Sequence, residues 1–197
     1  MMFAKPSIKT SETHPLRIDV VDADGCGGVL GLTFCPGKVQ PDAMNGPWAR
    51  DLVKDLQAIR DWGASALVNL LEAHEMRELQ VLQLAEAIGT SLAYFHLPIR
   101  DADIPGLDFE RSWKTVGAEL RRRLLDEEKI LIHCKGGLGR TGTVAARLLV
   151  ELGLDPEEAI RRVRRARPGS IETQAQEDYV RRQTPLKDLI TPNGDLS

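Results

Sequence analysis

One short segment, 133–142, limits the possible folds of this chain more than any other part of the sequence. It reads His-Cys-Lys-Gly-Gly-Leu-Gly-Arg-Thr-Gly, and the residues just before it, 129–133, predict a buried strand. The apolar residues of 141–152 predict a helix directly after it. A strand that enters a helix through a glycine-rich turn is typical of a layered α/β fold.

The same alternation of short apolar runs with longer amphipathic stretches extends along the chain. The predicted strands cover 16–21, 29–34, 66–71, 92–97 and 129–133, and the predicted helices cover 47–62, 72–88, 108–127, 141–152, 155–167 and 172–183. Turn residues between the first two strands indicate a hairpin. We therefore expect an α/β fold with a mostly parallel central sheet, helices on both faces in a three-layer arrangement, and an N-terminal hairpin.

The length of 197 residues fits one ordinary domain. We expect residues 1–15, which are polar and contain two prolines, to be a flexible lead-in, 16–190 to form the single domain, and 191–197 to be a frayed tail. An apolar fraction of 42% is enough to build a core.

The net charge of −3 gives no reason to expect binding to nucleic acid. No apolar run approaches the ~20 residues that a membrane span needs, and the first 13 residues lack the apolar centre of a signal peptide. We therefore expect a cytoplasmic protein without a membrane span. The oligomeric state is left open.

The three cysteines, Cys26, Cys35 and Cys134, show no CxxC spacing. An odd and sparse set of this kind is not typical of a disulfide framework or of a zinc site, so neither a metal nor a cofactor is expected. One cysteine in a special setting indicates a nucleophile instead. A redox role of Cys26 or Cys35 is left open.

The loop after Cys134 is suited to binding an oxyanion. Three of the five residues between Cys134 and Arg140 are glycines, which let backbone N–H groups converge on one point. The helix that begins near Arg140 directs its positive end to the same point, and the guanidinium matches two oxygens of a phosphate. The same field favours the thiolate form of Cys134.

Two neighbours of the loop are expected to support it. Thr141 can donate a hydrogen bond to the sulfur of Cys134, and His133 is expected to fix the loop through its ring nitrogens and not to transfer protons. A lone Cys-x5-Arg is more often structural, but the strand, the glycines and the helix here agree on a catalytic loop.

This segment resembles the signature of the protein tyrosine phosphatase superfamily, His-Cys-x5-Arg-Ser/Thr. Residues 133–149 are more closely similar to the kinase-associated dual-specificity phosphatases, the cyclin-dependent kinase inhibitor 3 type, whose loop also reads Gly-Gly-Leu-Gly-Arg. The resemblance implies a phosphatase domain in which Cys134 attacks phosphorus, forms a phosphocysteine intermediate, and is assisted by Arg140. It also implies a phosphate-binding loop made by Lys135, Gly136, Gly137, Leu138, Gly139, Arg140 and Thr141.

A phosphatase of this type also needs a proton donor for the leaving group. Asp101 and Asp103 lie between two prolines, directly after a predicted strand. The resemblance favours Asp101, because the family's acid is the first aspartate after a Pro-hydrophobic pair, here Pro98-Ile99; Asp103 is the alternative.

Hydrolysis of the intermediate needs an oriented water. The resemblance assigns this task to a glutamine, and the spacing before an aromatic residue favours Gln176 over Gln174. A solvated helical glutamine is the plain alternative.

The expected substrate is a phosphorylated protein or a small phosphorylated molecule. A phosphoinositide or inositol phosphatase remains an alternative, although lipid phosphatases related to tensin carry two basic loop residues and this chain has only Lys135, with Leu138 at the second place. A phospho-reader without activity would use the same loop. A sulfur transferase of the rhodanese type is disfavoured by the five-residue spacing and the Arg-Thr-Gly sequence. The arginines of 161–167 are expected to form a solvated, partly paired face, and a docking surface for a phosphorylated or acidic partner is the alternative.

Overall fold

The computed structural model describes residues 7–23 and 27–186 of the chain. Its main sheet has five strands in the order β1 (Asp19–Asp22), β2 (Val29–Phe34), β7 (Lys129–Cys134), β5 (Ala64–Asn69) and β6 (Ala93–His96). Strand β1 pairs antiparallel with β2, and every other pairing in this sheet is parallel. The mostly parallel sheet and the N-terminal hairpin are confirmed.

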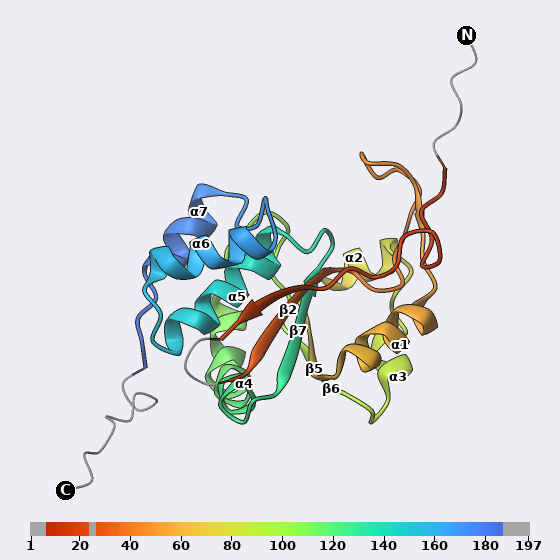
Figure 1. Cartoon of the computed structure of the whole chain (residues 1–197). Helices are drawn as coiled ribbons and strands as arrows, with labels where there is room; N and C mark the ends of the chain where they lie inside the picture. The colour runs from red at the N-terminus through yellow and green to blue at the C-terminus, as the bar shows by residue number, and fades with distance from the viewer. Residues whose placement is uncertain (1–6, 24–26, 187–197) are drawn as a thin grey trace, which may run out of the picture.

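Helices cover both faces of this sheet, which confirms the three-layer prediction (Figure 1). One face carries α4 (Leu107–Leu125), α5 (Gly139–Glu151), α6 (Pro156–Ala166) and α7 (Gln174–Arg181), and the other carries α1 (Leu52–Trp62), α2 (Ala73–Glu78) and α3 (Leu84–Ile88). Alternate residues of each buried strand supply the two cores: Ile130 and Ile132 pack on the first face, and Leu131 packs on the second.

The helix predicted over 47–62 begins later than expected. Trp48 continues the helical spacing of Leu52 upstream, but it lies in the short strand β4 (Trp48–Ala49), which pairs with β3 (Val39–Gln40). The reason is local, because Asp51 has an extended backbone and its carboxylate accepts the amide of Lys54 at 3.1 Å. This N-cap fixes the first helical residue at Leu52.

The helix predicted over 72–88 is divided into α2 and α3. Leu79, Val81 and Leu84 are all buried, and their spacing cannot be placed on one helical face. The chain turns at Gln80, which has a φ of 58° and brings each of these side chains to the core.

The described part of the expected lead-in lies along β4. The amide of Lys9 donates to the carbonyl of Pro47 at 2.9 Å, and the amide of Ala49 donates to the carbonyl of Lys9 at 3.0 Å. The expected tail, 191–197, lies outside the described residues. Within the described ranges, no helix has both the length and the apolar character needed to cross a membrane.

Candidate active site

The parallel strands bring three segments together at their carboxyl ends. Strand β7 ends at Cys134, β5 leads into α2, and β6 leads into the loop that contains Asp101. Because the carboxyl ends of parallel strands lie at one edge of a sheet, this edge collects residues that are distant in the sequence.

The loop after β7 folds back toward the sulfur of Cys134. The thiol is buried, and the amide of Gly137 donates to Cys134 Sγ at 3.2 Å. Gly137 has a φ of 72°, and a Cβ atom there would lie 2.2 Å from the carbonyl oxygen of Thr33 on β2. Only glycine therefore allows the loop to lie this close to the neighbouring strand.

Arg140 lies in the first turn of α5, and its side chain is buried. Its Nη1 donates to Glu75 Oε2 at 2.6 Å and to the carbonyl oxygen of Ile99 at 2.9 Å, and its Nη2 donates to Glu75 Oε1 at 2.8 Å. Burial by itself lowers the pKa of Arg140, but the hydrogen bonds and the charge of Glu75 outweigh it and hold the pKa above its ordinary value. The guanidinium is a fixed cation beside the loop.

Glu75 is a site residue that sequence reasoning missed. It lies in α2, and its carboxylate also accepts the backbone amide of Glu72 at 2.9 Å, as part of a capping box. Burial raises the pKa of Glu75, but the hydrogen bonds from Arg140 and from Glu72 lower it by more than burial raises it, so the pKa lies below its ordinary value. The spacing of the two glutamates indicates the capping box, but nothing in the sequence indicates the pairing with Arg140.

The two candidate acids differ in their surroundings. Asp101 Oδ1 lies 2.8 Å from Arg140 Nη2, and its side chain is 65% exposed to the pocket and solvent. Each carboxylate accepts the amide of the next residue, Ala102 N at 3.1 Å and Ile104 N at 2.8 Å, but Asp103 is not among the residues that line the pocket of Cys134. The structure thus brings Asp101 to the loop and leaves Asp103 outside it.

His133 and Thr141 are both fully buried beside the loop. His133 Nδ1 lies 3.5 Å from the carbonyl oxygen of Cys134, and burial lowers the pKa of the imidazole to about 3. The ring is therefore neutral at physiological pH. His133 Nε2 and Thr141 Oγ1 have no hydrogen-bond partner among the described residues, so the expected bond from Thr141 to the sulfur is not formed in this conformation.

Gln176 and Gln174 are clearly separated by their positions at the start of α7. Gln176 is fully buried; its Oε1 accepts the amide of Glu172 at 2.9 Å, and its Nε2 donates to the carbonyl of Asp103 at 3.1 Å. Gln174 is exposed and donates to Asp178 at 2.8 Å. Only Gln176 joins the α7 side of the site to the loop of the candidate acids.

Glu172 is a second site residue that sequence reasoning missed. Its Oε2 accepts the backbone amide of Gly139 at 2.8 Å, so a carboxylate occupies one of the loop's N–H groups in this conformation. A Cβ atom on Gly139 would lie 2.4 Å from the same oxygen, so a larger residue here would displace the end of the Glu172 side chain.

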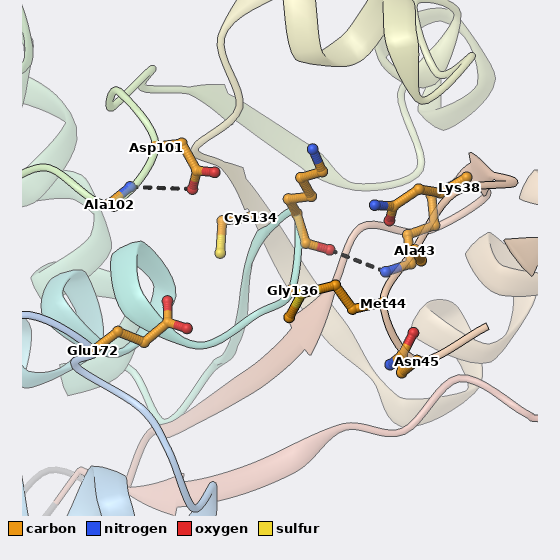
Figure 2. A pocket seen from close by; sticks show the side chains of 11 residues that line it. Lys38, Ala43, Met44, Asn45, Asp101, Ala102, Cys134, Gly136 and Glu172 are labelled. Carbon is orange, nitrogen blue, oxygen red and sulfur yellow. Dashed lines mark hydrogen bonds between the residues drawn. The ribbon is translucent and has the colours of Figure 1, made fainter. Parts of the chain in front are cut away.

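The loop forms one end of a pocket of about 450 Å³. Figure 2 shows Cys134 between two walls, with Asp101 and Glu172 on one side and Lys38 on the other. Burial lowers the pKa of Lys38 to about 8, and its Nζ donates to the carbonyl of Lys135 at 3.3 Å. The residues that line the pocket are Lys38, Gln40, Ala43, Met44, Asn45, Asp101, Ala102, Cys134, Lys135, Gly136 and Glu172.

The other cysteines lie apart from this pocket or outside the description. Cys35 is buried at the end of β2, and burial raises the pKa of its thiol, which stays neutral. Cys26 is outside the described residues. Across 7–23 and 27–186, no group of three His, Cys, Asp or Glu side chains is arranged to hold a metal ion.

Several arginines of the basic stretch in α6 are engaged within the fold. Arg161 and Arg162 pair with Glu158, and Arg164 pairs with Glu177 at 3.0 Å. These pairings agree with the expected partly paired face.

Comparison with known proteins agrees with this geometry. Residues 37–180 match the family model described as Swiss Army Knife protein, DSP-PTPase phosphatase domain. The chain is 32% identical to cyclin-dependent kinase inhibitor 3 of Rattus norvegicus and of Homo sapiens, in each case over 177 residues that cover 86% of this chain and 79% of the relative.

Solved structures show the same architecture. A crystal structure of kinase associated phosphatase, with its catalytic-site cysteine replaced by serine, has a TM-score of 0.74 and 29% identity, covering 84% of this chain and 92% of that chain. The active form of Tk-PTP has a TM-score of 0.57 and 26% identity, covering 87% of this chain and 95% of that chain. The chain therefore belongs to the dual-specificity branch of the protein tyrosine phosphatases, which are cysteine-dependent phosphomonoesterases.

Proposed function

We propose that this phosphatase works through a phosphocysteine on Cys134, with Arg140 as the phosphate ligand and Asp101 as the proton donor. One observation carries the assignment. Asp101 Oδ1 lies 2.8 Å from Arg140 Nη2, and Asp101 lines the same pocket as Cys134. A nucleophile, a cation for the oxyanion and an acid thus meet at one point.

In the first step the thiolate of Cys134 attacks phosphorus and an S–P bond forms. The bond from phosphorus to the ester oxygen breaks, and Asp101 gives its proton to that oxygen, so the product leaves as a neutral alcohol or phenol. The guanidinium of Arg140 and loop amides such as that of Gly137 hold the non-bridging oxygens. The buried carboxylate of Glu75 keeps the guanidinium oriented.

In the second step water attacks the phosphocysteine. Asp101, now ionised, accepts a proton from the water, the S–P bond breaks, and inorganic phosphate and the thiolate are released. We assign the orientation of this water to Gln176, whose amide lies beside Gly139 of the loop. The Gln176 side chain donates to the carbonyl of Asp103, so its position depends on the position of the loop that carries Asp101 and Asp103.

Substrate binding requires an exchange of partners at Arg140. In the free site, the Nη2 atom of Arg140 pairs with Asp101. A bound phosphate dianion would have to accept a hydrogen bond from the same Nη2 atom. We infer that the phosphate displaces Asp101 from Arg140, which frees the carboxyl group to face the leaving oxygen.

The substrate class that we propose is a phosphorylated protein, with a small phosphorylated molecule as the alternative. The similarity to proteins named cyclin-dependent kinase inhibitor 3 and kinase associated phosphatase supports the first choice. The cytoplasmic location stays a prediction from the sequence, which subcellular fractionation would test.

The test begins with aryl phosphate hydrolysis by the purified chain. We expect turnover that vanadate inhibits and that EDTA leaves unchanged, and no turnover by Cys134→Ser. Acid quenching during turnover, followed by mass spectrometry, should find phosphate on the peptide that contains Cys134. Retained phosphopeptide binding without hydrolysis would instead support a phospho-reader, and phosphate on another residue would contradict the mechanism.

A matched pair of variants tests the acid. Asp101→Asn should lower kcat by about 10²–10⁴-fold for a phenyl phosphate with a poor leaving group, and by much less for a nitrophenyl phosphate whose oxygen needs no proton. Asp103→Asn, on the same loop, should leave both rates close to those of the unchanged chain. The assignment is wrong if Asp103→Asn shows the dependence on the leaving group and Asp101→Asn does not.

A further inference from the structure

A buried polar cluster joins α4, α5 and α7 on the face of the sheet that these helices share (Figure 1). Its centre is Arg147 of α5, whose side chain is only 8% exposed. We call it the Arg147 cluster, and its members are Arg147, Glu110, Tyr179, Glu151, Trp113 and Arg121. The catalytic pocket is lined by other residues, so any effect of this cluster on catalysis must act through them.

The two ends of the Arg147 guanidinium have different partners. Its Nε donates to Glu151 Oε1 at 2.8 Å, and Glu151 lies one turn further along the same helix. Its Nη1 donates to Glu110 Oε1 of α4 at 2.7 Å and to the hydroxyl oxygen of Tyr179 of α7. The Nε bond therefore stays within α5, whereas the Nη1 bonds connect α5 to the two other helices.

Tyr179 and Glu110 also bond to each other. The hydroxyl of Tyr179 donates to Glu110 Oε1 at 2.6 Å. Burial and this bond raise the pKa of the phenol, so the hydroxyl keeps its proton throughout the physiological range. The proton lies toward Glu110, and the oxygen accepts from Arg147. The three side chains thus form a closed triangle of hydrogen bonds, in which each contact restricts the other two.

Aromatic rings enclose the same guanidinium. The Cζ atom of Arg147 lies 4.7 Å from the ring centre of Trp113, 5.6 Å from that of Tyr179 and 5.9 Å from that of Phe109. The Phe109 and Trp113 rings are stacked, with their centres 5.1 Å apart. Hydrogen bonds and rings together leave the guanidinium one position, and α4 and α7 both depend on it.

The cluster reaches the acid from the side of α4. We call residues 97–106, between β6 and α4, the acid loop, because it carries Asp101. The amide of Glu110 donates to the carbonyl of Gly106 at 3.0 Å, so Glu110 lies one turn from the point where the acid loop ends. Arg140 and Arg147 belong to the same helix and are seven residues apart, about 10 Å along its axis. The contact of Glu110 with Arg147 therefore fixes this end of the acid loop relative to Arg140.

The cluster reaches the acid loop a second time from the side of α7. Gln176 lies one turn before Tyr179 in this helix, and its Nε2 donates to the carbonyl of Asp103 at 3.1 Å. The acid loop is thus held both at its α4 end and at Asp103. Both supports lead to the Nη1 atom of Arg147.

We propose that Glu110, Tyr179 and Arg147 are positioning residues that hold the acid loop, and with it Asp101, in place beside Arg140. The inference rests on the proposed function and adds to it the contacts that place the acid. Proton transfer to the leaving oxygen requires hydrogen-bond distance, and a displacement of about 1 Å is enough to slow it strongly.

Two mild variants test the proposal. Removal of Arg147 would leave two glutamates without their shared cation and threaten the fold, so the test changes its partners, with Glu110→Gln and Tyr179→Phe. For a phenyl phosphate with a poor leaving group, we expect kcat/KM to fall at least about tenfold. For a nitrophenyl phosphate, whose oxygen needs no proton, it should change by less than about threefold. Vanadate affinity should stay the same, because the loop of Cys134 is unchanged.

The chain offers a matched control for each variant. Glu151→Gln makes the same change at the Nε end of Arg147. Tyr94→Phe removes the hydroxyl that accepts from Asn69 at 2.8 Å on the opposite face of the sheet. At a temperature where all variants are folded, both controls should hydrolyse the two substrates in the same ratio as the unchanged chain. An equal rise of this ratio in the controls overturns the proposal, because it then reports only lost stability.

Combination with Asp101→Asn shows whether the positioning residues act through the acid. Once Asp101 has lost its proton, Glu110→Gln and Tyr179→Phe should cause little further loss of kcat/KM for the phenyl phosphate. Losses that multiply in the double variants overturn the proposal.

Failure of the proposed function can be distinguished from failure of this inference. If Asp101→Asn alone shows no dependence on the leaving group, the acid of the proposed function is wrong, and the inference falls with it. If Asp101→Asn shows this dependence and neither Glu110→Gln nor Tyr179→Phe does, only the inference is overturned.

Discussion

Replacing Glu75 by glutamine tests whether the buried pair with Arg140 serves catalysis or only stability. The carboxylate accepts two hydrogen bonds from the guanidinium, at 2.6 and 2.8 Å, and both side chains are almost fully buried. Glutamine keeps the shape and one acceptor oxygen. Its NH2 group, however, turns a donor toward a donor of Arg140.

The geometry gives the size of the effect. A hydrogen bond to a charged group contributes about 1.5–3 kcal/mol, and the change removes one such bond and the buried carboxylate partner of the guanidinium, which keeps its ion pair with the 65% exposed Asp101. We expect the free energy of unfolding to fall by about 3 kcal/mol, which corresponds to a Tm lower by roughly 6–12 °C for a domain of this size. Because the guanidinium loses its orientation, kcat/KM should also fall, by about 10–100-fold.

Urea denaturation and steady-state hydrolysis of an aryl phosphate measure the two effects on the same preparation. The control is Glu151→Gln, in the last turn of α5. Glu151 is buried and accepts hydrogen bonds from Trp113 at 2.9 Å and from Arg147 at 2.8 Å. We expect this control to lose comparable stability with kcat/KM unchanged at a temperature where it is folded.

The two variants together can refute the reasoning. If Glu75→Gln loses stability as the control does but keeps its kcat/KM, the pair with Arg140 is structural only. If kcat/KM falls equally in both variants, the loss follows from general destabilisation and not from the position of the guanidinium.

Three further predictions concern the loop and its pocket. The pKa of His133 is about 3 in the fold and 6.5 in the unfolded chain, so between these values only the unfolded chain takes up a proton at this residue. Urea denaturation should therefore show a free energy of unfolding ~2 kcal/mol lower at pH 5 than at neutral pH from this group. The variant His133→Asn should lack this pH dependence. Gly137→Ala should abolish vanadate binding because its Cβ atom would meet the Thr33 carbonyl, whereas Gly136→Ala has no atom within 4 Å of its Cβ and should bind vanadate normally. Lys38 carries its charge below pH 8 and loses it above, so kcat/KM should decline above about pH 8 in the unchanged chain, and Lys38→Met should lack this component of the pH profile.

The parts of the fold that the sequence predicts well are those decided by neighbouring residues. Strand β2 covers the predicted 29–34, and the run of β7 into the loop and α5 follows from apolar residues and glycines that are adjacent in the chain. The start of α6 at Pro156, after the N-cap Asp155, is equally local. Where spacing is ambiguous, as at Trp48, the cap at Asp51 decides the helix boundary.

The candidate site is predictable only in part, for a related reason. Cys134 and Arg140 lie in one contiguous segment, so the sequence alone identifies that segment as a candidate catalytic loop. The pairing of Glu75 with Arg140 joins positions 65 residues apart, and the bond from Lys38 to the loop joins positions 97 residues apart. Glutamate and lysine are common on helices and loops, and only the packing of the sheet's two faces determines which of them reach the loop.

The bond from Gly139 to Glu172 has a consequence for selectivity among anions. The carboxylate of Glu172 accepts the loop amide at 2.8 Å, so an entering anion that binds this amide must replace it, and we expect Glu172 to act as a weak internal competitor. A monovalent ion such as chloride or acetate gains little by this replacement, whereas a phosphate dianion gains the guanidinium and several amides at once. We therefore expect the loop to discriminate among anions by their charge, and Glu172→Gln should bind monovalent anions more readily than the unchanged chain does.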